Sequence, residues 1–308
     1  MRNSNLILII LIFFGLKSQG QTTQTYQGVF ETRQTKGKAT YQYIENSNYE
    51  RVYVDNFKYV ADKNTMLITG TYQEGVKDGT WKYSVTNFPV TAGIQNATAS
   101  GNYELGKMDG IWTYSCNNIQ KFMNVANNQK VNSKVSFFNG VLTGQFEYSE
   151  TNTYGNSSLA IKGKFDENGL FDSTWIVKKR EKGLNYENIR KYISGILYFN
   201  LYRNSGTGEI LAKEENTLNL NEFFGKYNEE ENVGTIQGET YYLEPIKYYP
   251  SVYSNDLNRE LYKSICFWKN NHLEFFGTGI IDPINYQFEV QQGTINTVFY
   301  PERKIIIK

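Results

Sequence analysis

A phrase of fifteen residues occurs twice in this chain, and it constrains the fold more than any other feature. Residues 70–84 read GTYQEGVKDGTWKYS, and residues 101–115 read GNYELGKMDGIWTYS. The tryptophans of the two copies are 31 residues apart (112 − 81). A fixed period of this size is typical of repeat architectures, in which each unit buries its apolar face against its neighbours.

Each copy has the pattern of a β-hairpin. In the first copy, Trp81 and Tyr83 alternate with polar neighbours, and residues 68–73 alternate in the same way. Alternation with period two predicts half-buried strands. Gly75 and the pair Asp78-Gly79 lie between these strands, and Asp-Gly favours a turn because glycine reaches φ > 0 without a Cβ clash. One hairpin alone is marginally stable in water, so the units are expected to pack side by side.

Weaker copies extend the pattern in both directions. Residues 135–149 and 163–175 keep the order of aromatics and turn residues, residues 28–59 form a weaker first unit, and residues 84–96 are expected to connect two units. We expect the repeat core to consist of Tyr72, Trp81, Tyr83, Tyr103, Trp112, Tyr114, Phe137, Phe146, Tyr148, Phe165 and Trp175. We expect the repeat turns to contain Gly75, Gly79, Gly106, Gly110, Gly140 and Gly144.

The repeated phrase resembles the MORN family in its antitoxin-type variant form. The resemblance is close in residues 70–84 and 101–115, fair in 135–149 and 163–175, and fades after Val177. It implies stacked β-hairpins that act in scaffolding and in contacts with proteins or, in some members, lipids. It supplies no catalytic residue, and an antitoxin role would require the cytoplasm.

Composition and the C-terminal half fit an all-β chain of stacked antiparallel hairpins that form an elongated sheet or solenoid. The chain has 25 Tyr, 19 Phe and only 5 Pro, and aromatic residues favour a half-buried pleated surface. Residues 193–213 predict another hairpin, residues 234–242 and 273–287 predict strands, residues 254–268 predict a short amphipathic helix, and the last residues predict a pairing strand. We therefore divide the mature chain into repeats over 21–178 and a divergent cap region over 179–308.

The N-terminus predicts export. Arg2 precedes an apolar run over residues 6–16, and Ser18 and Gly20 form a small-x-small cleavage site, as in a secretory signal peptide. The run is shorter than the roughly twenty apolar residues that span a bilayer. We expect a signal peptide over residues 1–20, a mature start at Gln21, no later transmembrane segment, and a periplasmic or secreted protein.

Residues that commonly act in catalysis or metal binding, such as histidine and cysteine, are few in this chain. A single histidine, His272, follows a turn-like stretch, and Cys116 and Cys266 lack the spacing of a redox or zinc site. Buried thiols are favoured slightly over a bridge between these two cysteines. The net charge of +1 does not indicate nucleic-acid binding. We interpret the basic run 178–182 as a solvated strand at the edge of the sheet. Asp172-Ser173-Thr174 resembles an O-glycosylation acceptor only weakly.

Two function classes follow from these observations. The first is a secreted, non-enzymatic scaffold or binding module that presents a β-repeat surface to another protein or a surface glycan, with no cofactor, no metal and no nucleic acid. The second is an envelope hydrolase that uses an Asp/Glu pair, since Asp and Glu total 31 although no pair is marked as acid and base.

Overall fold

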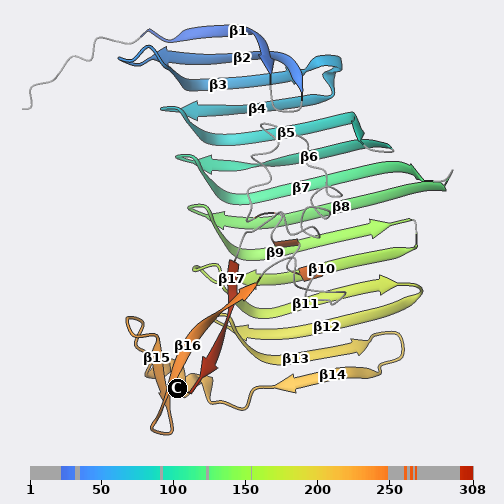
Figure 1. Cartoon of the computed structure of the whole chain (residues 1–308), viewed down its shortest axis with the longest axis vertical. Helices are drawn as coiled ribbons and strands as arrows, with labels where there is room; N and C mark the ends of the chain where they lie inside the picture. Colours follow the sequence, from blue (N-terminus) through green and yellow to red (C-terminus); the bar gives the residue numbers. More distant parts are fainter. Residues whose placement is uncertain are drawn as a thin grey trace, which may run out of the picture.

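The chain folds into a long open sheet of consecutive antiparallel strands, as a computed structural model shows (Figure 1). The structure describes residues 22–31, 35–90, 93–122, 125–153, 155–248, 260–261, 264–265, 268 and 299–307. Strands β1 to β14 stack in chain order, each hydrogen-bonded to the next. The all-β, elongated fold predicted from the sequence is therefore confirmed.

The strands have the following bounds: β1 Gln24–Glu31, β2 Lys36–Glu45, β3 Arg51–Ala61, β4 Met66–Gln73, β5 Val76–Val90, β6 Gly93–Glu104, β7 Lys107–Phe122, β8 Val125–Phe138, β9 Val141–Asn152, β10 Ser157–Phe165, β11 Phe171–Glu181, β12 Leu184–Ile193, β13 Ile196–Asn204 and β14 Ile210–Glu215. A 3₁₀ turn, η1 Asp62–Asn64, joins β3 to β4. The predicted connection over residues 84–96 is wrong, because β5 and β6 fill nearly all of it as one long hairpin.

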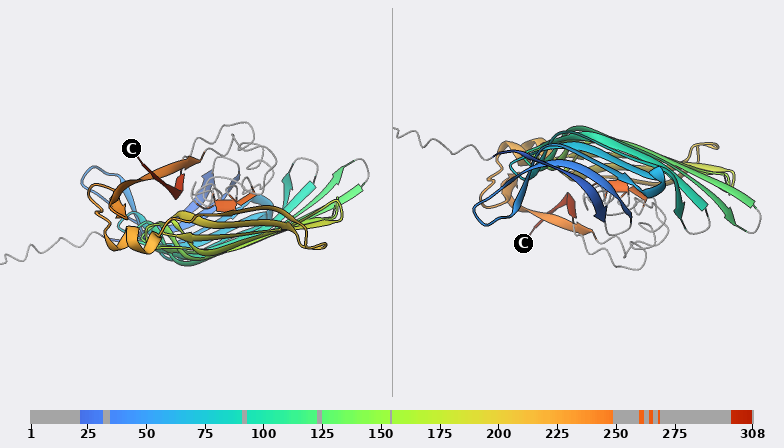
Figure 2. Two further views of the ribbon diagram at one scale, coloured as in Figure 1. Left: turned by 90° about the horizontal axis from the view of Figure 1, so that it is seen from below. Right: turned by 90° about the horizontal axis from the view of Figure 1, so that it is seen from above.

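The two faces of this sheet differ in chemistry. We call the side that carries Trp81, Trp112 and Trp175 the core face, and the opposite side the polar face. The core-face side chains form one continuous buried cluster from β2 to β12. The sheet is curved, and the C-terminal elements lie on its concave side (Figure 2). Curvature therefore allows one layer of sheet to enclose a core that a flat sheet would leave open.

The C-terminal part closes over the core face at one end of the sheet. It contains the helix α1 Leu220–Gly225 and the strands β15 Val233–Ile236, β16 Glu239–Tyr248 and β17 Phe299–Ile306. Strand β17 pairs with β16 and touches β13 through one parallel bridge, Ile196 to Arg303. A second apolar cluster, centred on Phe223, holds α1 and the β15–β16 hairpin against β13.

The predicted helix over 254–268 is described at five positions, all of them helical: Glu260, Leu261, Ser264, Ile265 and Trp268. Leu261, Ile265 and Trp268 are buried in the main core. The Trp268 indole donates to the Ser133 hydroxyl on β8 at 2.9 Å. The apolar stripe at helical spacing therefore packs on the core face, as its amphipathic pattern predicts.

The six turn glycines divide into two groups, and this corrects the sequence prediction. Gly75, Gly106 and Gly140 occupy two-residue hairpin turns with φ of +84°, +82° and +83°. The other three, Gly79, Gly110 and Gly144, lie inside strands β5, β7 and β9, also at positive φ. They mark bulges, where the pairing shifts between neighbouring residues. Glycine is favoured at a bulge for the same reason as in a turn, so its presence alone does not separate the two.

Each Asp-Gly pair has a structural use that depends on the next hairpin. The Asp78 carboxylate accepts a hydrogen bond from the backbone N–H of Leu105 at 3.2 Å, in the turn that follows. Asp109 accepts from Asn139 N–H at 3.3 Å in the same way. In addition, Gly106 and Gly140 donate their N–H groups to backbone carbonyls of the preceding unit. These bonds join consecutive turns to one another along the side of the sheet where these strands end.

The repeated tryptophans pack on glycines. Trp81, Trp112 and Trp175 are at most 1% exposed. A Cβ atom on Gly70, Gly101 or Gly163 would lie within 2.0–2.2 Å of the respective indole ring. Each indole N–H also donates to a backbone carbonyl one residue beyond that glycine, at 2.9–3.0 Å. The repeat therefore needs its first glycine for space and its tryptophan for volume.

Candidate functional site

The polar face of the sheet carries ordered rows of side chains, because directly paired residues of neighbouring strands point to the same side. One row, called here the lysine row, consists of Lys58, Thr69, Lys82, Ser100, Thr113, Lys134, Glu147 and Lys162. The parallel hydroxyl row consists of Ser84, Thr98, Ser115, Asn132 and Ser149. Both rows cross the repeats at right angles to the strands.

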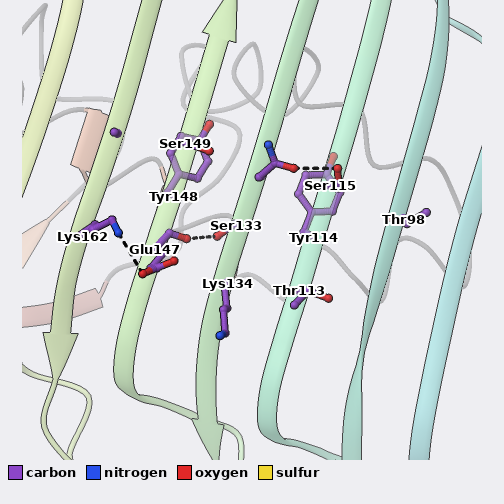
Figure 3. Close-up of a pocket in the computed structure, with 12 residues that line it drawn as sticks. Thr98, Thr113, Tyr114, Ser115, Ser133, Lys134, Glu147, Tyr148, Ser149 and Lys162 are labelled. Carbon is purple, nitrogen blue, oxygen red and sulfur yellow. Dashed lines mark hydrogen bonds and ion pairs between the residues drawn. The ribbon is translucent and has the colours of Figure 1, made fainter.

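A hollow of about 500 Å³ lies between these rows over β6 to β10 (Figure 3). Its lining combines hydroxyls, an amide, two ammonium groups and one carboxylate, from Thr98, Thr113, Ser115, Asn132, Lys134, Glu147, Ser149 and Lys162, with Tyr114, Ser133, Tyr148 and Ala160 completing it. The Ser115 hydroxyl donates to Asn132 Oδ1 at 2.9 Å, and the Ser100 and Thr113 hydroxyls are 3.1 Å apart. The short side chains of the hydroxyl row leave the space, and the longer lysines border it.

The electrostatics of the hollow are those of a hydrated surface. Lys162 and Glu147 form an ion pair at 3.3 Å, but their side chains are 72% and 50% exposed. An exposed pair of this kind contributes little to stability. Beyond β10, Glu187 accepts from Arg203 and pairs with Lys178 at 3.4 Å. The hydrogen bond from Arg203 is the main cause that lowers the pKa of Glu187, so this carboxylate is charged at neutral pH.

A second polar cluster lies on the core face, at the ends of β6 to β9 opposite to the turns that contain Gly106 and Gly140. Hydrogen bonds link Gln95, Cys116, Asn118 and Gln129 in sequence across the sheet. The Gln129 amide then donates to Glu150 at 2.6 Å, and the Tyr148 hydroxyl donates to the same carboxylate at 2.9 Å. Burial, and then the neighbouring carboxylate, raise the pKa of Tyr148 well above its ordinary value.

This second cluster bears on the hydrolase alternative. Glu150 borders a small hollow of about 190 Å³ together with Lys179, Glu181 and Glu260. Both carboxylate oxygens of Glu150 already accept hydrogen bonds from protein groups, as expected of a structural tie rather than a general base. In the described part of the chain, no three His, Cys, Asp or Glu side chains are grouped so as to hold a metal ion. We therefore take the hollow on the polar face as the candidate site.

A buried ionic group joins the C-terminal part to the repeats. Arg190 and Glu302 have side chains only 8% and 6% exposed, and their charged groups lie 4.0 Å apart. The Tyr192 hydroxyl donates to the Glu302 carboxylate, and Arg190 Nε donates to Asn188. Burial and the adjacent carboxylate raise the pKa of Tyr192 well above its ordinary value. This group fixes β17 over β12.

The aromatic residues named from the sequence lie in the core, and two of them, Tyr114 and Tyr148, also border the hollow from below as core-face positions of their strands. Nine of the eleven aromatic core positions are buried, and Tyr72 and Tyr148 are partly buried against the same cluster. The basic run over 178–182 lies in β11 and the turn after it, and β11 is paired on both sides, so its assignment to a sheet edge is wrong. Ser173, the weak glycosylation candidate, takes φ of +57° and starts a bulge in β11.

Other predicted features lie wholly or partly outside the described residues. These are the signal peptide over 1–20, Gln21, the strand over 273–287, His272 and Cys266. Cys116 is buried in the core. The described residues contain no helix that is long and apolar enough to cross a membrane.

The rows of the polar face were not predicted from the sequence. Their residues are ordinary serine, threonine, asparagine and lysine at alternate strand positions, so no motif marks them. They come together only through the register of eight separate strands. Comparison of the sequence with models of protein families and with curated proteins finds no match.

Proposed function

We propose that this protein is a secreted, non-enzymatic binding module, built of MORN-like β-hairpin repeats, that holds a polar protein segment or glycan on its polar face. The observation that carries this proposal is the hollow of about 500 Å³ between the lysine row and the hydroxyl row. It offers hydrogen-bond donors and acceptors on five adjacent strands, which a rigid sheet holds at fixed spacing.

The two faces of the sheet have different roles, and this difference supports a binding function. The core face supplies the packing that stabilises the sheet, whereas the hydroxyl row makes no contribution to the apolar core. Side chains of the hydroxyl row are therefore free to match a ligand with little effect on stability. Export, which the N-terminal segment predicts, would place this face among envelope or extracellular ligands.

The proposal is tested by obstructing the hollow. Thr113→Trp combined with Asn132→Trp places two large rings in it, at exposed strand positions that tolerate aromatic residues. Thr40→Trp is the matched control, because Thr40 is exposed on the same face at β2 but does not line the hollow. Immobilised proteins are incubated with envelope extract, and bound material is identified by mass spectrometry and glycan analysis.

We expect the wild type and Thr40→Trp to retain the same material and the double variant to lose it. Retention of that material by all three proteins would refute a role for the hollow. Capture of nothing beyond an unrelated secreted control would refute the binding function itself.

A further inference from the structure

The central band of the polar face is basic although the whole chain carries a net charge of only +1. The lysine row, the hydroxyl row with its continuation to Lys178, and the next row, which contains Lys130 and Arg180, form the central band of this face. Between β3 and β11 this band carries seven basic side chains and one carboxylate. The basic ones are Lys58, Lys82, Lys130, Lys134, Lys162, Lys178 and Arg180, and the carboxylate is Glu147.

Most of this charge is unneutralised. Within the described part of the chain, Lys58, Lys82, Lys130 and Lys134 are exposed and make no ion pair, whereas Lys162 pairs with Glu147 and Lys178 pairs with Glu187 of β12 at 3.4 Å. Lysines on a sheet interior are not needed to protect an edge, because their strands are paired on both sides. The band therefore presents a positive field along the sheet, which attracts an anionic ligand.

The spacing of the charges indicates an extended ligand. Lys58, Lys82, Lys134 and Lys162 lie on β3, β5, β8 and β10, so consecutive lysines are two or three strands apart. At roughly 4.8 Å between strands, these separations are on the order of 10–14 Å. The strand spacing is close to the length of one pyranose unit, so a chain of sugars crossing the strands would meet a cation every second or third unit.

The chemistry of the hollow favours a sugar over the other polyanions. Between Lys82 and Lys134 the row offers only the hydroxyls of Ser100 and Thr113, and the adjacent row adds further hydroxyls and the Asn132 amide. Such groups form hydrogen bonds with ring hydroxyls. Among the lining residues the only aromatic ones, Tyr114 and Tyr148, are strand positions of the core face, so the hollow has no ring for stacking nucleobases.

We propose that the polar face binds an acidic polysaccharide, with carboxylate-bearing sugars lying along the lysine row and across the hollow. This inference rests on the proposed binding function and specifies its ligand class. Because much of the attraction is between exposed charges, affinity should fall steeply with salt.

The test uses the full mature chain and four probes: alginate as a polyuronate, dextran as a neutral polysaccharide, a single-stranded oligonucleotide, and phosphatidylserine-containing vesicles. Lys82→Glu combined with Lys134→Glu reverses two charges of the lysine row. Lys226→Glu combined with Lys304→Glu is the control, because it changes the net charge equally, at the residue that follows α1 and on β17, away from this face. Thermal melts establish that both variants are folded.

We expect wild type and control to bind alginate, with negligible binding of dextran, and the lysine-row variant to bind alginate about tenfold or more weakly with a shallower salt dependence. Equal loss in both variants would show that only net charge matters and would overturn the proposal. Preference for the oligonucleotide or the vesicles would also overturn it. Retention of an envelope ligand that is salt-insensitive and unaffected by the lysine variant would refute the acidic-glycan inference but leave the binding function standing.

Discussion

The packing of each tryptophan on a glycine predicts that these two positions are coupled in size. A Cβ atom on Gly101 would lie 2.1 Å from Cδ2 of the Trp112 ring. The ring cannot move aside easily, because it is fully buried and its N–H donates to the Asn102 carbonyl at 2.9 Å. Overpacking of a core costs about 1–3 kcal/mol, and we expect Gly101→Val to lower the free energy of unfolding by about 3 kcal/mol or more.

The third repeat unit shows how a side chain larger than glycine is accommodated at this position. In the third unit, Val135 stands at the place of Gly101 and lies opposite Phe146, a smaller ring that is also fully buried. Trp112→Phe alone should cost about 1–3 kcal/mol, because it removes volume and the indole hydrogen bond. In the presence of Gly101→Val, however, the smaller ring makes room for the new side chain.

The double variant should therefore be more stable than the sum of the single effects predicts, by about 1–3 kcal/mol. Equilibrium urea denaturation followed by circular dichroism measures the three free energies of unfolding. Thr113→Val is the control on the exposed side of the same strand and should change stability by less than about 0.5 kcal/mol. Strict additivity of the two core substitutions, within about 0.5 kcal/mol, would refute size coupling as the reason for the glycine.

Two further outcomes follow from the structure and one from the N-terminal sequence. Glu302→Ala removes the buried carboxylate that faces Arg190 and accepts from Tyr192, and it should cost about 3–5 kcal/mol in a thermal or urea melt. Tyr148 and Tyr192 have pKa values raised above 10 by burial, so below pH 10 they are neutral in both states, and above it only the unfolded chain ionises. Stability should therefore fall as the pH rises beyond 10, with part of the phenolate absorbance appearing only together with unfolding. Intact mass of the natively exported protein should correspond to a chain beginning at Gln21.

Each of these outcomes has a comparison that can contradict it. Lys304 lies on β17, the strand of Glu302, and forms a half-exposed ion pair with Glu244 of β16. If Lys304→Ala lowered the stability as much as Glu302→Ala does, the role of the buried pair would be refuted. Phenolate formation by all tyrosines while the fold is intact would contradict their burial. A mature chain that keeps residues 6–16 would refute export by a cleaved signal peptide.

Local features of the sequence sufficed to predict the class of fold. Alternation with period two specifies strands, and glycines at fixed positions specify places where φ is positive, because both are properties of a few consecutive residues. The tandem phrase adds that the units pack in order. The aromatic residues of the core face could be named for the same reason.

The tertiary structure decided what depends on partners distant in the sequence. Whether an Asp-Gly pair forms a turn or a bulge depends on the opposite strand, which is why Gly79 and Gly75 cannot be distinguished by residue type. The cover of the core face by β17 and Trp268 depends on contacts over more than a hundred residues. The lysine row is decided by register, since a shift of one residue in any strand would turn its lysine into the core.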